Sequence, residues 1–321
     1  MMNNKEFKNL DEQIAIMEHK GMTVNDKEHA KEVLMRENYF FLNGYRHIFL
    51  KSVTDKKFIP GTTFEELYSL FLFDRSFRNI IFKNLLVIEN NIKSIISYQL
   101  SKKYGYKESE YLKPKNFTSN PERSRQVQDL IKKMKRQVRV NAKQHSATSH
   151  YVNNYGYIPL WILVKVLSFG IVGELYAILK KDDQDQIADL YHLEVDTLIT
   201  YLPILSNYRN LCAHEDIVFE NRTQRSIDDT LYHSLLKIEK MDGEYIYGKN
   251  DIFALIIMMK QMLKDNEFKD MMLEIELDIN NLQYNLKTIP IEKVLDRMGF
   301  PENWHQLTNI TKKVEEWEGK Y

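Results

Sequence analysis

The segment Tyr208–Glu215 combines side chains suited to chemistry on a phosphodiester. Arg209 precedes His214 by five residues, and Asn210 lies between them. Arginine presents a planar fork of donors to phosphate oxygens, and histidine accepts or donates a proton near neutral pH. On a regular helix Asn210 and His214 share a face, whereas Arg209 is rotated by about 140° from His214 and must reach round with its long stem. The spacing predicts phosphate binding by Arg209 and proton transfer by His214, with Asn210 orienting the imidazole. On spacing alone, a solvated helix end with a surface arginine is the competing interpretation.

Signatures of several other enzyme classes are missing from the sequence. It contains no Gly-rich phosphate loop ending in Lys-Ser or Lys-Thr, no His-Glu-x-x-His, no Cys-x-x-Cys and no Gly-x-Ser-x-Gly. Their absence excludes most NTPases, metalloproteases and hydrolases. The single cysteine, Cys212, cannot form a disulfide framework or a Cys-based zinc site within one chain. This favours a reducing cytosol, and we expect Cys212 to be a small buried thiol.

The amino-acid composition limits which fold classes are possible. The 321 residues include 45 basic and 45 acidic side chains, so a chain that is basic throughout is excluded while a local basic patch is not. Apolar residues make up 43% of the chain and aromatic residues 12%, which excludes a disordered protein. With 11 glycines and 7 prolines, the chain has too few turn residues for a β-sandwich or barrel. The prediction is therefore an all-α architecture.

Helical periodicity and capping patterns give the expected elements. Asn25, with Glu28, marks the N-cap of one helix, and Thr63, with Glu66, begins a longer helical stretch that ends at Gly105. The remaining expected helices are 12–20, 160–167, 171–180, 184–191, 195–213, 225–240, 252–265 and 270–286. The polar residues 146–154 are expected to form a mobile loop.

The most apolar stretch, residues 157–179, is assigned to the core rather than to a membrane. It contains Lys165 and Glu174, and a spanning helix disfavours charges near its middle. Two packed helices that meet near residues 168–170 explain the stretch better. The first ten residues have no apolar signal-peptide core, which agrees with a cytoplasmic location. Four aromatic residues are expected in the core: Tyr39, Phe40, Phe41 and Trp304.

A strongly basic helix is expected over residues 123–143, after a helix start at Asn120-Pro121-Glu122. Its apolar stripe is narrow, and most of its other positions are lysine or arginine. A cationic ridge in a neutral protein is suited to a phosphate backbone, although a solvated helix face is the competing interpretation. Four side chains are the predicted RNA contacts: Lys132, Lys133, Arg136 and Arg139. Three following tyrosines are expected either to pack or to stack on unpaired bases: Tyr151, Tyr155 and Tyr157.

The segment Arg209–His214 resembles the Arg-Asn-x-x-x-His motif of HEPN-superfamily ribonucleases, in particular the Abi-like family of phage abortive-infection proteins of the AbiD/AbiF type. Four further parts of the chain resemble that family in the same order: residues 20–22 with 34–45, 89–105, 159–170 and 299–304. The last of these reads Gly-Phe-Pro-Glu-Asn-Trp. Lys93 departs from the family pattern, which has arginine there, so a phosphate-binding role is not transferred to it.

The resemblance implies an all-α HEPN-type helical bundle, metal-independent endoribonuclease activity and a toxin role in phage defence or a toxin–antitoxin system. It implies Arg209 and His214 as catalytic residues, Asn210 as their support, and Glu89 as an acid that pairs with Arg209. It implies no cofactor, and it adds a small structured antitoxin RNA as an expected partner. The expected domains are an N-terminal helical extension (1–60), a helical core with the basic helix near 121–143 (61–240), and a C-terminal helical region packed on the core (241–321).

The sequence thus predicts an endoribonuclease that cuts RNA by attack of a 2′-hydroxyl on the adjacent phosphodiester. That reaction needs a base at the nucleophile and an acid at the leaving oxygen, whereas one chain supplies one motif. We therefore expect a homodimer with a shared cleft. Two other interpretations stay open: a catalytically inactive HEPN-type module that binds RNA or a partner protein, and a helical scaffold whose basic helix binds no ligand.

Overall fold

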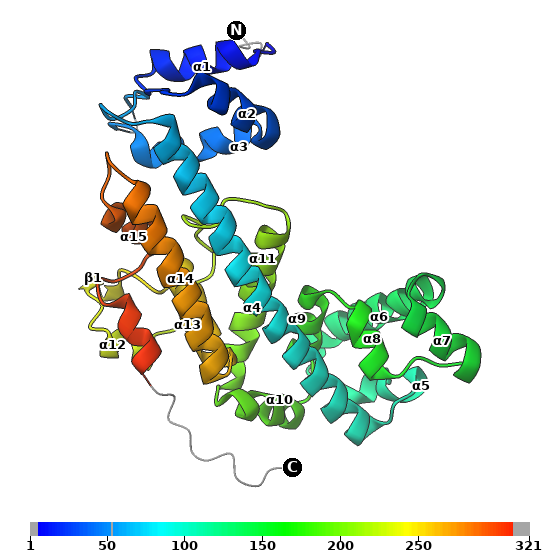
Figure 1. The fold of residues 1–321 in the computed structure, drawn as a ribbon. Helices are drawn as coiled ribbons and strands as arrows, with labels where there is room; N and C mark the ends of the chain where they lie inside the picture. The colour runs from blue at the N-terminus through cyan, green and yellow to red at the C-terminus, as the bar shows by residue number, and fades with distance from the viewer. Residues whose placement is uncertain (1–5, 53, 311–321) are drawn as a thin grey trace.

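A helix of 41 residues, α4 (Phe64–Tyr104), crosses the molecule and contacts elements from all parts of the chain (Figure 1). The computed structural model describes residues 6–52 and 54–310. Thr63 caps the N-terminus of α4 through a capping box with Glu66, and Gly105, with a φ of 89°, ends the helix. A positive φ is the conformation that glycine adopts without strain. Both predicted ends of this helix are confirmed.

Four short elements precede α4: α1 (Leu10–His19), α2 (Lys27–Glu37), α3 (Tyr39–Gly44) and the 3₁₀ helix η1 (Tyr45–Phe49). The N-cap of α2 is Asp26, whose carboxylate accepts a hydrogen bond from the His29 backbone N–H at 2.9 Å. The prediction of Asn25 is therefore wrong by one residue. Asp26 is an equally strong N-cap residue, and it has the extended backbone that an N-cap requires.

The aromatic residues of α3 do not all enter the core. Phe40 and Phe41 are 74% and 56% exposed, so their predicted burial is wrong, and Tyr39 is half-buried. The helix has only six residues and buries Leu42 instead. Trp304 is buried, as predicted.

A group of shorter helices follows α4: α5 (Glu108–Tyr111), η2 (Pro114–Asn116), η3 (Pro121–Arg123), α6 (Ser124–Gln144), α7 (Ser146–Tyr155), α8 (Leu160–Val166) and α9 (Phe169–Ala177). Asn120 caps η3 with its side chain, and α8 and α9 meet next to Ser168, so both predictions are confirmed. The loop predicted at 146–154 is wrong because these residues form α7. That helix packs along α6, and such tertiary packing stabilises a polar segment without an apolar stripe of its own.

The next part of the chain contains α10 (Lys181–Ala188), η4 (Asp189–Tyr191), α11 (Val195–Ala213), α12 (Leu231–Leu235) and the antiparallel pair β1 (Lys240–Met241) and β2 (Glu244–Tyr245). The bounds of α11 are those predicted. The helix predicted at 225–240 is wrong, since α12 alone is helical there. The N–H groups of Thr223 and Ile227 donate to the carbonyls of Asn250 and Lys249, and these long-range bonds replace helical ones.

The C-terminal elements are α13 (Ile252–Met262), α14 (Asp265–Asn285), α15 (Ile291–Met298) and η5 (Trp304–Asn309). Almost every residue of α13 is buried, and α14 packs along α4 (Figure 1). The all-α class is confirmed, with α4, α11 and α13 sharing one apolar core. Among the described residues, no helix combines the length and apolar character needed to cross a bilayer.

Candidate active site

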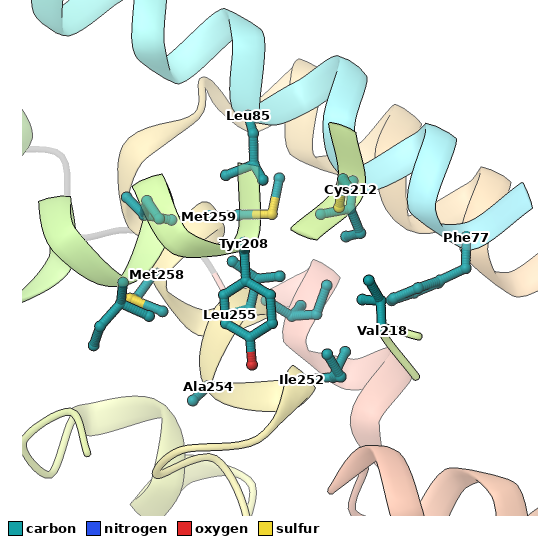
Figure 2. Packing of buried hydrophobic residues seen from close by; sticks show 14 of the residues in the cluster. Phe77, Leu85, Tyr208, Cys212, Val218, Ile252, Ala254, Leu255, Met258 and Met259 are labelled. Carbon is teal, nitrogen blue, oxygen red and sulfur yellow. The ribbon is translucent and has the colours of Figure 1, made fainter. Parts of the chain in front are cut away.

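The register of α11 decides which motif residues reach the surface. Tyr208 and Cys212, one helical turn apart, are buried among apolar side chains of α4 and α13 (Figure 2). Because these two residues define the inward face, the residues between them lie on the flank and the outer face of the helix. Arg209 is accordingly half-buried and Asn210 is exposed.

A buried carboxylate holds Arg209. The Nε atom of Arg209 donates to Glu89 Oε2 at 3.1 Å, and the second carboxylate oxygen of Glu89 accepts from Lys93 Nζ at 2.6 Å. The Glu89 side chain is 5% exposed, whereas that of Arg209 is 33% exposed. The guanidinium also lies 5.7 Å from the ring centroid of Phe82. Within the described residues the Nη atoms of Arg209 make no hydrogen bond, so one edge of the guanidinium is fixed and the other is available.

The structure thus places Glu89 beside Arg209, as the family resemblance implies. Lys93, the residue that departs from the family pattern, shares the same carboxylate and is 10% exposed. It neutralises Glu89 and is not directed toward solvent as a free cation. Lys93, Glu89 and Arg209 form a linear network of ion pairs from α4 to α11, and Arg209 is its most exposed member.

His214 lies just past the end of α11. It is the C-cap residue, and its N–H donates to the Asn210 carbonyl at 3.0 Å. Its side chain is exposed, and no hydrogen bond joins its ring to the Asn210 amide, although both residues are described. The predicted orienting contact is thus not formed in this structure. Because the bond from the His214 N–H to the Asn210 carbonyl is the i→i−4 bond of the helix, His214 still follows the last turn of α11, and the chain leaves the helical path after it, at Glu215 with a φ of 57°.

A buried network fixes the chain that follows His214. Asp74 on α4 accepts hydrogen bonds from the backbone N–H groups of residues 218 and 219 at 3.2 and 2.8 Å. Arg78, one turn along α4, pairs with Asp74 at 2.7 Å and donates to the Asp216 carbonyl at 3.3 Å. This pair was not predicted from the sequence. Its signal is an aspartate and an arginine at i and i+4 on an otherwise apolar face of α4.

Cys212 does not take part in chemistry at this site. It is buried, as predicted, and burial raises the pKa of its thiol to about 12. The thiol therefore stays protonated near neutral pH and is a poor nucleophile. In residues 6–52 and 54–310, no group of three or more His, Cys, Asp or Glu side chains is arranged to hold a metal ion.

The four basic residues predicted to contact RNA all lie exposed on α6. Lys133 pairs with Glu174 of α9 at 2.7 Å, and Lys132 is 3.8 Å from an aspartate one turn earlier. Arg136 and Arg139 have no carboxylate within salt-bridge distance in the part of the chain that the structure describes. The uncompensated charge of α6 therefore lies toward its C-terminal half.

The three tyrosines after α6 belong to a larger aromatic cluster. Tyr151, Tyr155, Tyr157, Tyr106 and Trp161 lie with successive ring centroids 5.4 to 6.2 Å apart. Tyr155 and Trp161 are nevertheless 56% and 43% exposed. The rings thus pack on one another and keep accessible faces. Stacking on RNA bases stays a prediction.

Comparison with known proteins identifies one family. The family model described as Abi-like protein matches residues 32–220, a span that contains Glu89, α6 and the whole Arg209–His214 motif. No curated protein and no solved structure matches the chain. The resemblance to the Abi-like family is confirmed, although residues 20–22 and 299–304 lie outside the matched span.

Proposed function

The chain belongs to the Abi-like protein family, and we propose that it is a metal-independent, HEPN-type endoribonuclease. This enzyme acts as a toxin in abortive infection or in a toxin–antitoxin system. The geometry of the motif carries the proposal. Arg209 is held along one edge by a buried carboxylate, and His214 is exposed five residues later. Cleavage of a phosphodiester needs these two functions, charge stabilisation and proton transfer.

In this reaction the RNA supplies its own nucleophile. The 2′-hydroxyl loses its proton and its oxygen attacks the adjacent phosphorus, while the 5′-oxygen of the next nucleotide leaves with a proton. The product is a 2′,3′-cyclic phosphate. Arg209 binds the phosphate through the Nη atoms that Glu89 leaves unoccupied, and His214 acts as base or acid. A second copy of the chain supplies the other proton-transfer group.

RNA binding beyond the motif is assigned to α6. Its exposed basic residues suit a phosphate backbone in a sequence-independent manner, and Arg136 and Arg139 are the ones without carboxylate partners in the described residues. A small structured RNA that restrains the toxin would use the same chemistry. Both RNAs are partners that we propose on the basis of the family and of this charge distribution.

Cleavage of a labelled single-stranded RNA by purified variants tests the assignment. His214→Ala removes a proton carrier, so the cleavage rate should fall by about 10² to 10⁴-fold while RNA affinity changes little. Arg209→Ala removes a charged phosphate contact and should weaken both cleavage and binding. His305→Ala, which removes an exposed histidine on η5, is the matched control and should change neither.

The wild-type enzyme should keep its activity in EDTA and leave 2′,3′-cyclic phosphate ends. If His214→Ala cleaves as fast as the wild type, or if EDTA stops the reaction, the assignment is wrong. RNA binding without any cleavage would select the inactive RNA-binding module instead.

A further inference from the structure

A cavity of about 450 Å³ lies directly beyond the motif, between α3, η1, α4 and the loop after α11. Residues 215–217, which follow His214, line it together with Phe40, Phe41 and Arg46. Its volume falls within the ~300–1,000 Å³ typical of small-ligand pockets. The cavity therefore has room for one nucleotide beside the proposed catalytic residues.

Contacts within the described chain connect this cavity to the motif. Arg78 donates to a carbonyl of the loop at 3.3 Å, and a Cβ atom on Gly44 would lie 2.7 Å from Ile217 Cδ1. The loop and α3 are thus in close contact, and a side chain at Gly44 would require the end of the Ile217 side chain to move. On α4, Arg78 is one helical turn, ~6 Å, from Phe82, whose ring lies near the Arg209 guanidinium. The cavity and Arg209 therefore lie next to each other along one face of α4.

Two exposed phenylalanines form the aromatic side of the cavity. The rings of Phe40 and Phe41 form an edge-to-face pair with centroids 5.9 Å apart, and both are more than half exposed. Asn38, with a φ of 68°, accepts a hydrogen bond from the Phe40 N–H at 2.9 Å. A non-glycine residue at positive φ is strained, and here it fixes the turn that directs the two rings outward.

The cavity lining carries charges of both signs, since it includes Arg46 and, on the loop after α11, Glu215 and Asp216. Arg46 is half-buried and donates to a backbone carbonyl of α3 at 2.9 Å, and no carboxylate lies within salt-bridge distance of it among the described residues. Burial lowers the pKa of Lys20, and the nearby charges of Arg46 and Lys56 lower it further. Lys20, Arg46 and Lys56 thus lie near one another, and of these three Arg46 is the residue that lines the cavity. By contrast Arg75, which also lines the cavity, is neutralised by two hydrogen bonds to Glu37.

We propose that this cavity binds one unpaired nucleotide of the RNA next to the cleaved phosphate, with its base on Phe40 and Phe41 and its phosphate at Arg46. The inference rests on the proposed function for the identity of the ligand. Aromatic rings stack on bases of any sequence, and arginine binds phosphate through paired donors. If the cavity instead bound an apolar surface of a partner protein, the Arg46 side chain would be left without a counter-charge.

A non-cleavable RNA probe measures binding at this subsite independently of cleavage. The probe is a uniformly 2′-O-methylated RNA oligonucleotide with one 2-aminopurine, whose fluorescence falls when the base stacks. Wild-type protein should quench the fluorescence. The double variant Phe40→Leu, Phe41→Leu keeps the apolar bulk and removes the rings, so it should abolish the quenching and weaken binding by about 5- to 100-fold. Tyr284→Ala, which removes an exposed tyrosine on α14, is the control. Arg46→Gln should lower the log–log salt slope by about 0.7.

Each outcome distinguishes the subsite from the proposed activity. Quenching by a protein that cleaves no RNA would support the subsite and contradict the endoribonuclease assignment. Active cleavage with unchanged affinity and quenching in the leucine variant would overturn the subsite and leave the activity in place. Loss of dimerisation in that variant, with base quenching retained, would assign the rings to a subunit contact and also overturn it.

Discussion

Glu89 lies between two cations, Lys93 and Arg209, and its carboxylate determines the direction of the guanidinium. Replacing Glu89 by glutamine keeps the shape and removes the charge. The nearly buried Lys93 then has no counter-charge, so the free energy of unfolding should fall by about 3 kcal/mol. Cleavage should fall by about 10²-fold, because a misplaced catalytic group loses its alignment.

Adding Lys93→Met to Glu89→Gln removes the unpaired cation. Denaturant titration should then show recovered stability, while cleavage stays low because Arg209 remains unanchored. Recovery of cleavage together with stability would show that Glu89 supports only the fold and does not position the arginine.

For single residues, the sequence indicates which chemistry a side chain can perform more readily than how far that side chain is exposed to solvent. The motif and the pairing of Glu89 with Arg209 could be inferred because residue type and family pattern specify them. The exposure of Phe40 and Phe41 could not, since an aromatic run in an apolar context has the same composition whether it packs inside or lies at a cavity rim. The Asp74–Arg78 pair was missed because its partners are backbone atoms more than 100 residues away in the chain.

At the scale of elements, prediction succeeded where local signals decide the outcome. The ends of α4 follow from the Thr63 capping box and from Gly105, both within one turn of the boundary. The helix predicted at 225–240 does not form, because the backbone N–H groups of Thr223 and Ile227 donate to the carbonyls of residues 250 and 249. No local sequence pattern indicates these partners. The single short helix there, α12, contains the buried histidine His233.

His233 makes the stability of this element depend on pH. Burial lowers its pKa. The neutral ring is satisfied on both sides, with Nδ1 accepting from the Thr230 N–H at 3.0 Å and Nε2 donating to the Gly248 carbonyl at 2.9 Å. A lowered pKa means that the unfolded chain binds a proton at a pH where the folded chain does not. The contribution of His233 to stability should therefore be complete above pH ~7.5 and decline as pH falls through ~6.5, the unfolded value.

Urea titrations at pH 7.5 and pH 5.5 measure this effect. The wild type should lose more unfolding free energy between the two conditions than His233→Gln, which has no titrating ring. The carboxylates are the same in both proteins, so their contribution cancels in the comparison. Equal losses in the two proteins would show that His233 does not titrate on unfolding.

Although the whole molecule has no net charge, α6 concentrates exposed basic side chains that we propose bind RNA. The double change Arg136→Gln, Arg139→Gln should weaken binding to all RNA sequences and lower the log–log salt slope by about 0.7 to 0.9 for each phosphate that is no longer neutralised. Lys132→Gln should have a smaller effect and Lys133→Gln the smallest, because Glu174 already pairs with Lys133. Lys27→Gln with Lys269→Gln, both exposed and outside α6, is the control. An unchanged slope in the arginine variant would identify α6 as a solvated face.

The proposed reaction determines which assembly is expected. One chain supplies one Arg209–His214 pair, while in-line attack needs proton transfer at both the nucleophile and the leaving oxygen. The exposed position of His214 at the end of α11 leaves it accessible to a second motif across a two-fold axis. The domain boundaries near residues 60 and 240 stay a prediction, and so does the dimer.

Dilution tests the dimer directly. If two motifs form one site, specific activity should fall as protein concentration drops below the dimer dissociation constant, in step with the monomer fraction seen by light scattering. Mixing His214→Ala with Arg209→Ala adds a second readout. In a mixed dimer each mutant chain keeps the residue that the other lacks, so activity above that of either variant alone would indicate a shared site. A monomer that cleaves at full rate across the dilution series would contradict the two-motif mechanism and require a second proton-transfer group within one chain.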